Sequence, residues 1–211
     1  MKDRNTRERI VEAARDLFWE KGYTATGLAE LLQRAGANSG SFYHFFESKD
    51  AVLRTVLDTY EDLLDPHVIR PAFDRHEQPI ERIFALLHSY RERLVSTNCQ
   101  YGCPIGRLAL ELDAENAPAH ERIARNFTAW RKAVEACVRE AGIAQPEDVA
   151  AFVLTVMEGA VMQSRAFGSI EPFDACVRQL RVHFDALTTK TSTAPTTTKT
   201  TKTTKRPRRP R

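Results

Sequence analysis

Apolar residues recur at spacings of three and four along most of the chain, the pattern typical of amphipathic helices. No stretch alternates with period two for long enough to predict a strand. The sequence therefore predicts an all-α protein, with its main helices at residues 3–22, 48–64, 79–96, 117–141, 146–167 and 172–187. Helix-breaking residues separate these segments; they are Gly22, Pro66, Pro71, Pro79, Pro118, Gly142, Pro146 and Pro172.

The first fifty residues contain two shorter helical segments after a first amphipathic helix. The first helix has an apolar face made of Ile10, Ala13, Ala14, Leu17 and Phe18. Thr26 is placed to cap a second helix, "GLAELLQRA". A tight turn around Gly36 follows, and Asn38 is a good cap for a third helix, "SGSFYHFF". A support helix and two short helices joined by a glycine-containing turn indicate a helix-turn-helix.

The third of these helices combines small polar residues with aromatic ones. Its first residues, Asn38 to Ser41, are small or able to hydrogen-bond, as the part that enters a major groove must be. Phe42 and Phe45 lie three residues apart, so we expect them to face inward and hold the helix in place. Tyr43 and His44 lie off that stripe and are free to reach DNA.

The residues after the third helix begin another helix. Ser48 is placed to cap it, which puts Lys49 in its first turn beside free backbone amides. A lysine at that point predicts a clamp for a DNA phosphate.

The segment "GYTATGLAELLQRAGANSGSFYHFFESKDAVL" resembles the DNA-binding domain of the TetR family of bacterial transcriptional regulators. The matching features are Gly-Tyr after the first helix, Thr26, Ala35-Gly36, Gly40, the run from Phe42 to Phe46, and Ser48-Lys49. The resemblance implies phosphate contacts from Thr26, Tyr43 and Lys49. It implies positions facing bases at Ser39, Gly40, Ser41 and His44, with Asn38 beside them. One departure is Ser39, where many members have lysine.

The same resemblance implies how the rest of the chain is organised. We expect a three-helix helix-turn-helix domain at 1–48 and a helical ligand-binding and dimerisation domain at 49–187, with about nine helices in all. The last two helices, within residues 146–187, are expected to form a four-helix interface with a second copy. Their small residues permit close approach and their large ones supply apolar area; they are Ala150, Ala151, Phe152, Val153, Val156, Gly159, Ala160, Phe167, Val177, Leu180 and Phe184.

The segment "CQYGCPIGRLALELDAENAP" interrupts the helical pattern and then resumes as a short helix. It resembles the corresponding region of the LmrA/YxaF-like branch of TetR regulators. A mostly apolar cavity with a few polar groups is the usual form of a small-molecule site. The candidates for lining such a site are Phe84, Leu87, His88, Tyr101, Leu108, Glu111, Phe127, Trp130, Met157 and Met162.

Charge is distributed unevenly along the 211 residues, whose net charge is +3. Residues 55–187 hold fourteen basic and twenty acidic residues, a net charge of −6, so the middle of the chain should avoid nucleic acid. Residues 188–211 hold eight basic residues and no acid, and their composition predicts a disordered tail. Two interpretations of that tail stay open: a solubilising extension, or an arm that holds DNA non-specifically.

The chain has no apolar run long enough to span a membrane and no signal peptide, so we expect a cytoplasmic protein, at the nucleoid when bound to DNA. The function that the resemblance implies is a repressor that binds double-stranded operator DNA as a homodimer. A small apolar or aromatic effector releases it, and no cofactor is expected.

Three other functions compete with this one. Cys99 and Cys103 could form a redox or soft-metal sensor, although no nearby pattern completes a four-ligand set. The basic composition of residues 188–211, taken by itself, would fit a DNA-binding architectural protein. An enzyme is disfavoured because the chain carries no phosphate-binding loop, nucleophile elbow or zinc motif.

Overall fold

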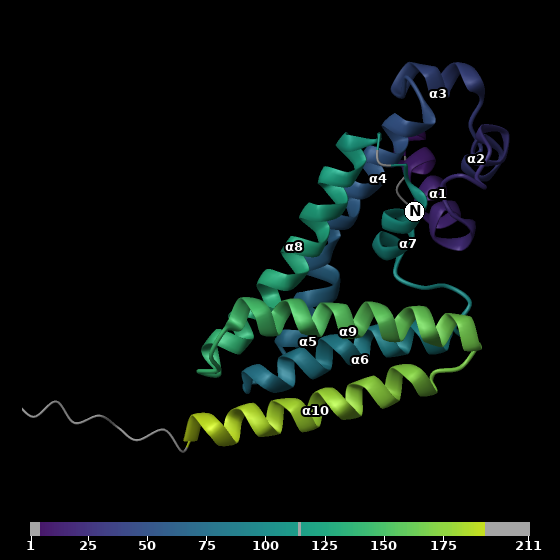
Figure 1. The fold of residues 1–211 in the computed structure, drawn as a ribbon. Coiled ribbons are helices and arrows are strands. Elements are labelled where there is room, and N and C mark those ends of the chain that lie inside the picture. The colour runs from purple at the N-terminus through teal and green to yellow at the C-terminus, as the bar shows by residue number, and fades with distance from the viewer. Residues whose placement is uncertain (1–4, 114, 193–211) are drawn as a thin grey trace, which may run out of the picture.

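The computed structural model describes residues 5–113 and 115–192, and over these ranges the fold is all-helical without a strand (Figure 1). This confirms the all-α prediction. No described helix has the length and apolar character needed to cross a membrane. The elements are α1 Thr6–Lys21, α2 Leu28–Ala35, α3 Ser39–Phe45, α4 Lys49–Leu64, the π-helical turn η1 Asp65–Ile69, α5 Arg70–Phe73, α6 Pro79–Ser96, α7 Pro104–Glu111, α8 Ala117–Glu140, α9 Pro146–Phe167 and α10 Glu171–Ser192.

Polar caps fix the starts of α3 and α4 as predicted. The Asn38 side chain accepts a hydrogen bond from the backbone N–H of Ser41 at 2.8 Å. The Ser48 side chain accepts a hydrogen bond from the backbone N–H of Ala51 at 3.1 Å. Each cap satisfies one of the backbone donors that a helix N-terminus leaves unpaired, so the short α3 begins at a defined residue.

The start of α2 differs from the prediction. Its cap residue is Gly27, and no side chain caps it. Thr26 is fully buried, and its hydroxyl donates to the Gly22 carbonyl at 2.6 Å. The predicted cap is wrong because the Thr26 hydroxyl bonds to the carbonyl of Gly22, the C-cap of α1, and not to a backbone N–H of α2.

Pro66 and Pro71 do not separate helices. The chain passes from α4 through the π-helical turn η1 directly into α5. A π-helical turn relieves the clash that proline makes with the preceding turn, and it leaves the missing N–H without consequence.

The C-terminal helix is longer than predicted. Helix α10 runs to Ser192, so residues 188–192 are helical and do not belong to a disordered tail. The remainder of the predicted basic tail, residues 193–211, lies outside the described residues.

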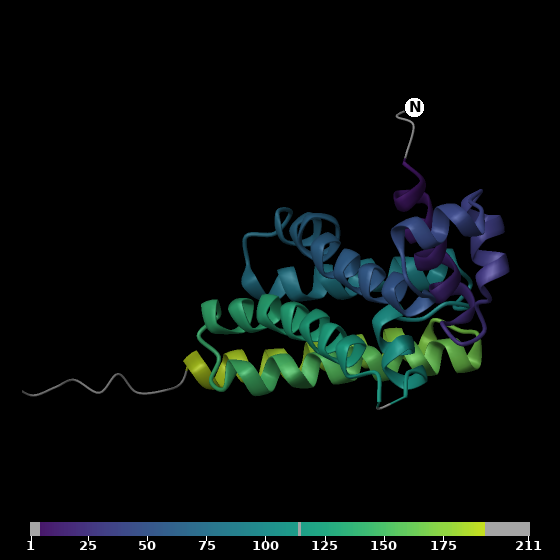
Figure 2. The ribbon, with the colours of Figure 1, turned by 90° about the horizontal axis from the view of Figure 1, so that it is seen from above.

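Helices α1, α2 and α3 form a head at one end of the molecule, and α6, α9 and α10 form a body at the other (Figures 1 and 2). Helix α4 leads from the head, and α8 packs along it. Each part has its own hydrophobic cluster. The head cluster also takes in Ile105 and Leu108 of α7 and Ile123 of α8, so the head packs directly on these two helices.

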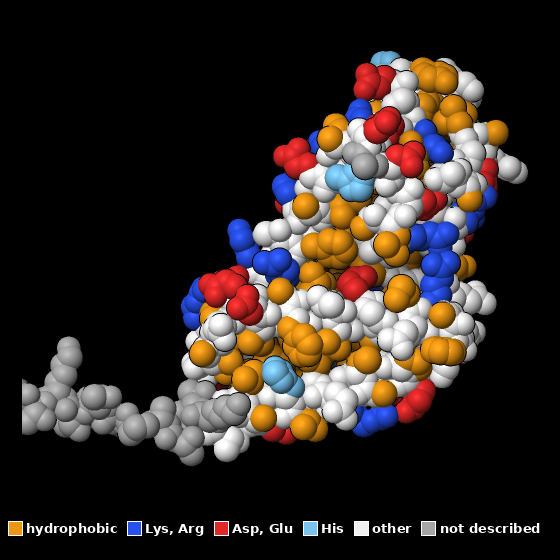
Figure 3. Space-filling model, viewed as in Figure 1, with side chains coloured by type: hydrophobic (Ala, Val, Ile, Leu, Met, Phe, Trp, Pro, Cys, Tyr) orange, Lys and Arg blue, Asp and Glu red, His pale blue; other side chains and the backbone are white. Residues whose placement is uncertain are grey.

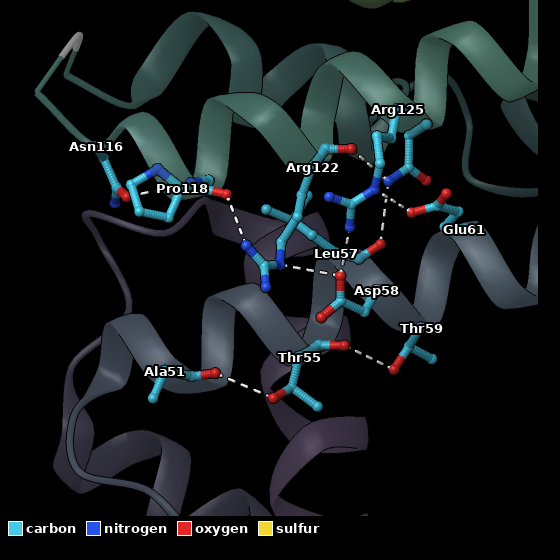
Figure 4. A network of polar contacts seen from close by, with 12 residues as sticks. Ala51, Thr55, Leu57, Asp58, Thr59, Glu61, Asn116, Pro118, Arg122 and Arg125 are labelled. Atoms are coloured by element: carbon cyan, nitrogen blue, oxygen red, sulfur yellow. Dashed lines mark hydrogen bonds and ion pairs between the residues drawn. The ribbon is translucent and has the colours of Figure 1, made fainter.

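A polar network joins α4 to α8 (Figure 4). The Asp58 carboxylate accepts from the Arg122 and Arg125 guanidinium groups, both at 2.9 Å, and Glu61 accepts from Arg125 at 3.0 Å. Beside these pairs, the buried Asn126 amide donates to the Leu57 carbonyl at 3.0 Å. Helix α4, which leads from the head, is therefore bonded to α8 by these side chains.

Candidate nucleic-acid interface and cavity

Helix α3 lies at the far end of the molecule from α10 and presents its polar residues to solvent (Figure 1). Ser39, Gly40 and His44 are exposed, Ser41 is half-buried, and Tyr43 is 60% exposed. The exposed face therefore contains the residues expected to read bases together with Tyr43. Asn38 is also exposed, but its side-chain oxygen is engaged in the cap.

Two phenylalanines hold α3 in place, and one of them differs from the prediction. Phe42 is fully buried, as expected, but its partner is Phe46, which is 5% exposed. Phe45 is 40% exposed and stacks edge-on against His44, with ring centroids 4.7 Å apart. The prediction for Phe45 is wrong because the chain leaves the helix at Phe46, whose extended backbone turns that ring into the core.

The two residues expected to bind phosphate beside Tyr43 face inward. Thr26 has no exposed surface, so its predicted phosphate contact is not available in this conformation. The Lys49 ammonium donates to the carbonyls of Tyr23 and Thr26, both at 2.9 Å, and lies 4.1 Å from the Tyr23 ring centroid. Burial lowers the pKa of Lys49. Lysine has three donors, so one remains, and its contact with phosphate stays a prediction.

A cavity of about 260 Å³ lies where α4, α6, α8 and α9 meet the start of α7. Three of the predicted ligand residues, Phe127, Trp130 and Met157, line it. Most of the lining is apolar or aromatic. The full set is Arg15, Tyr60, Leu63, Leu64, His67, Val68, Tyr90, Arg93, Cys103, Pro104, Ile105, Asn126, Phe127, Trp130, Leu154, Met157 and Glu158.

Several predicted ligand residues lie outside this cavity. Leu87 is fully buried in the body core, and Met162 is 60% exposed on α9. Phe84 packs against Phe184, and His88 pairs with Glu92 at 3.4 Å on the surface. Phe84 and His88 border a separate surface depression. The helical pattern of the sequence could not tell which neighbouring helix covers each of these residues.

The remaining three candidates connect the body to the head. Leu108 belongs to the head cluster, and the Tyr101 ring packs on Trp19 with centroids 5.1 Å apart. Glu111 accepts hydrogen bonds from the backbone N–H groups of Tyr23 at 3.0 Å and Thr24 at 2.7 Å. These side chains are therefore placed for contact between α7 and the head, and none of them lines the cavity.

Glu111 fits against the head because of Gly22. This glycine has φ 97°, a conformation that residues with a Cβ rarely adopt. A Cβ there would lie 2.5 Å from a Glu111 carboxylate oxygen. On the same side, the Trp19 indole donates to the Gly102 carbonyl at 2.8 Å. The last turn of α1 and the loop after it are thus bonded to the two ends of the segment that contains α7.

The start of α7 belongs to the cavity. Cys103, Pro104 and Ile105 line it, and Gly106 leaves room for the Glu158 carboxylate from α9. One eight-residue helix therefore touches the cavity at its first turn and the head at its last residue, Glu111.

Sequence reasoning missed lining residues from α4, α6 and α9, above all Tyr60, Tyr90 and Glu158. Glu158 did carry a signal, because it is an acid within the otherwise apolar run "VLTVMEGAVM". Tyr60 and Tyr90 carried none, since aromatic residues on amphipathic helices are most often core.

Cys99 and Cys103 lie in surroundings that do not favour a thiol sensor. Burial raises the pKa of both thiols, which disfavours the reactive thiolate form. Among residues 5–113 and 115–192, no cluster of histidine, cysteine or acidic residues is arranged to hold a metal.

Two family models match the chain. Residues 10–56 match the model of bacterial regulatory proteins of the tetR family, and residues 79–179 match the C-terminal domain of LmrA/YxaF-like transcriptional regulators. The uncharacterized HTH-type transcriptional regulator Rv0196 of Mycobacterium tuberculosis is 32% identical over 182 residues, covering 83% of this chain and 92% of the relative. The HTH-type transcriptional repressor DhaR of a Mycobacterium species is 28% identical over 192 residues, covering 88% and 93%.

Solved structures share the fold. The crystal structure of a regulatory protein TetR from Rhodobacter sphaeroides superimposes with a TM-score of 0.76 at 22% identity, covering 83% of this chain and 97% of the other. At that identity the likeness shows the arrangement of helices and no more. The relatives found by sequence are transcriptional regulators and not enzymes.

Proposed function

Because this chain belongs to the TetR family of bacterial transcriptional regulators, in its LmrA/YxaF-like branch, we propose that it is a ligand-responsive repressor. It binds a palindromic operator as a homodimer and is released by a small apolar or aromatic effector. The observation that carries the proposal is α7, which borders the cavity with Cys103 and Ile105 and holds the head with Glu111. The name of the relative DhaR, a repressor, supports the same mode of action.

The exposed face of α3 is the proposed reading surface. Ser39, Ser41 and His44 supply hydrogen-bonding groups for base edges, and the absence of a side chain at Gly40 permits close approach. Tyr43 is placed to contact the phosphate backbone from the same face. A single short helix reads too few bases for useful specificity, so two copies on a palindrome are required.

The proposed dimer forms through residues about 146–187, where α9 and α10 expose apolar side chains. Phe152 is 46% exposed, Phe167 72% and Val182 61%, and the Phe152 ring lies 5.3 Å from the ring of His183 across the two helices. Figure 3 shows hydrophobic side chains over α9 and along its border with α10. Other residues named for this interface, such as Ala150, Val153, Ala160, Leu180 and Phe184, are buried within the chain itself.

Effector binding is proposed to act through α7. A molecule in the cavity presses on the first turn of this helix, and the helix carries Glu111 and the loop after α1 with it. Release requires that the effector bind the conformation with poor DNA affinity better than the other, since equal binding shifts nothing.

The test is selection of duplexes by the full chain from a random DNA pool, which should enrich an inverted repeat. Compounds that raise the melting temperature of the protein are then tested for release of the selected duplex. Leu154→Trp, which fills the cavity, should bind the duplex but resist release. Equal affinity for all duplexes, governed only by salt, would favour an architectural protein instead. Release by oxidant or metal that requires Cys99 and Cys103 would favour a thiol sensor.

A further inference from the structure

The cavity lining contains two buried polar atoms without a hydrogen-bond partner among the described residues. One is Nε1 of Trp130, a side chain from α8 that is 3% exposed; it interacts with the Tyr90 side chain but forms no hydrogen bond of ordinary geometry with it. The other is Oε1 of Glu158, from α9. Nearly all buried polar groups in proteins are paired, and leaving one unpaired is costly. An unpaired donor and an unpaired acceptor that line one cavity therefore indicate a site where a bound molecule supplies the missing hydrogen-bond partners.

The Glu158 carboxylate is positioned by the start of α7. Its Oε2 occupies space beside Gly106 that any side chain at that position would fill. The Cys103 thiol lies beside the same carboxylate and interacts with it. These two contacts hold the carboxylate in position, and its Oε1 atom stays without a hydrogen-bond partner.

Among the described residues, Glu158 is the only acidic side chain that lines the cavity, and none of the basic lining residues forms an ion pair with it. Of the basic lining residues, Arg15 is paired with Asp16 at 3.3 Å, and His67 and Arg93 are exposed to water. Burial raises the pKa of Glu158, and the interaction with Cys103 opposes this only in part. A buried carboxylate without a partner is a charge that a bound cation stabilises.

Aromatic rings make up much of the remaining lining. Tyr60, Tyr90 and Phe127 join Trp130, with the rings of Tyr90 and Trp130 in a T-shaped arrangement 6.4 Å apart. Aromatic faces attract organic cations as well as apolar rings, and the attraction is strongest where water is excluded.

We propose that the cavity binds a compact lipophilic amine. Its protonated nitrogen donates to Glu158 Oε1, an ether or carbonyl oxygen accepts from Trp130 Nε1, and its ring packs among the aromatic side chains. This rests on the proposed function, because it names the chemical class of the effector. An anionic head group would place like charge against the Glu158 carboxylate, so we expect the cavity to prefer the amine.

Four commercially available indoles test the proposal by calorimetric titration of the full chain without DNA. They are 5-methoxytryptamine, the alcohol 5-methoxytryptophol, the anion 5-methoxyindole-3-acetate, and tryptamine, which lacks the ether oxygen. We expect 5-methoxytryptamine to bind about tenfold or more tightly than the alcohol, the loss typical of an unpaired buried charge partner. The anion should not bind measurably, and tryptamine should bind several-fold more weakly.

Two variants assign these preferences to their residues. Glu158→Gln should remove the preference for the amine over the alcohol, while Trp130→Phe should remove the preference for 5-methoxytryptamine over tryptamine. Thermal unfolding checks that each variant is folded, and Glu158→Leu replaces the first variant if the glutamine disrupts packing.

The proposal is overturned if the anion binds as tightly as the amine, if the amine does not bind, or if Glu158→Gln keeps the amine preference. Failure of the proposed function gives a different result. In that case the amine binds with the stated preferences but leaves the selected DNA duplex bound.

Discussion

At the scale of single residues, Gly22 and Glu111 form the most specific connection between head and body. An acid at the last residue of a helix is unfavourable, because the helix C-terminus carries partial negative charge. Here the carboxylate accepts two backbone N–H groups from the loop after α1, and Gly22 provides the space for it. The pair therefore stabilises the contact between α7 and the head at the cost of an unfavourable helix end.

Replacing Glu111 by alanine should lower the free energy of unfolding by about 2 kcal/mol, because two charge-assisted hydrogen bonds of a half-buried carboxylate are lost. It should also weaken release of DNA by effector, since α7 no longer holds the loop. Urea denaturation and DNA titration with and without effector measure the two effects. The exposed Glu115→Ala is the control, and equal results for both variants would contradict the role of Glu111.

The division of contacts on α3 gives a second prediction. Tyr43→Phe removes a hydroxyl placed for a phosphate and should weaken binding to all operator variants by a similar factor. Ser41→Ala removes a group expected at a base edge and should change the order of preference among them. Fluorescence anisotropy on a panel of single-base operator variants separates these outcomes, and the reverse pattern would overturn the assignment.

At the scale of elements, the contact between α4 and α8 combines exposed ion pairs with one buried amide. Asp58 and Arg125 are each more than 40% exposed in their side chains, so water and salt screen their attraction. Asn126 is 5% exposed, and its amide donates to the carbonyls of both Leu57 and Arg122. The buried amide should therefore contribute more to holding the two helices together than the more numerous ion pairs around it.

Asn126→Ala should lower the free energy of unfolding by about 2 kcal/mol, because two hydrogen bonds are lost and the Leu57 carbonyl stays buried. Asp58→Ala should lower it by about 0.5 kcal/mol. Chemical denaturation at low and high salt compares them. We expect salt to reduce the effect at Asp58 and leave the effect at Asn126 unchanged, and a larger loss at Asp58 would contradict this ranking.

At the scale of the whole molecule, the hydrogen-bonding face of α3 and the exposed apolar side chains of α9 and α10 lie at opposite ends. The head exposes the hydrogen-bonding face of α3, while α9 and α10 expose Phe152, Phe167 and Val182. Exposed apolar side chains grouped on two adjacent helices are unusual for a monomer and typical of an interface. The arrangement suits a pair of chains joined through the body, with two heads free to bind the same duplex.

The double variant Phe152→Asp with Val182→Asp should convert the dimer to a monomer and lower operator affinity at least tenfold, because carboxylates would be buried at the interface. Light scattering coupled to gel filtration measures the mass. Leu110→Asp is the matched control, since this leucine is 83% exposed but lies on α7. A double variant that stays dimeric would place the interface elsewhere.

Local patterns predicted those features whose causes lie within a few residues. The caps at Asn38 and Ser48 and the limits of α6, α8 and α9 agree closely with the sequence, because capping and helical periodicity are local effects. Phe45 was misassigned because spacings of three and four are both compatible with one helix face. Which of Phe45 and Phe46 is buried depends on the backbone conformation at the end of α3.

The candidate cavity was predictable only in part. Phe127, Trp130 and Met157 line it, but Phe84 and Leu87 satisfy the same helical pattern and are core. Glu111 was predicted to line the cavity, but it does not, and its carboxylate binds backbone N–H groups of the head. The sequence contains no signal for which helix covers a given face, because that depends on residues far away in the chain.

The sequence by itself determined the all-helical fold, the limits of most helices and the caps at Asn38 and Ser48, since each follows from contacts along one short segment. Only the tertiary structure decided that Thr26 and Lys49 turn inward, that Glu158 and Trp130 share a cavity, and that α7 joins this cavity to the head. These features need side chains from helices distant in sequence to meet, and their positions are set by the packing of the whole molecule.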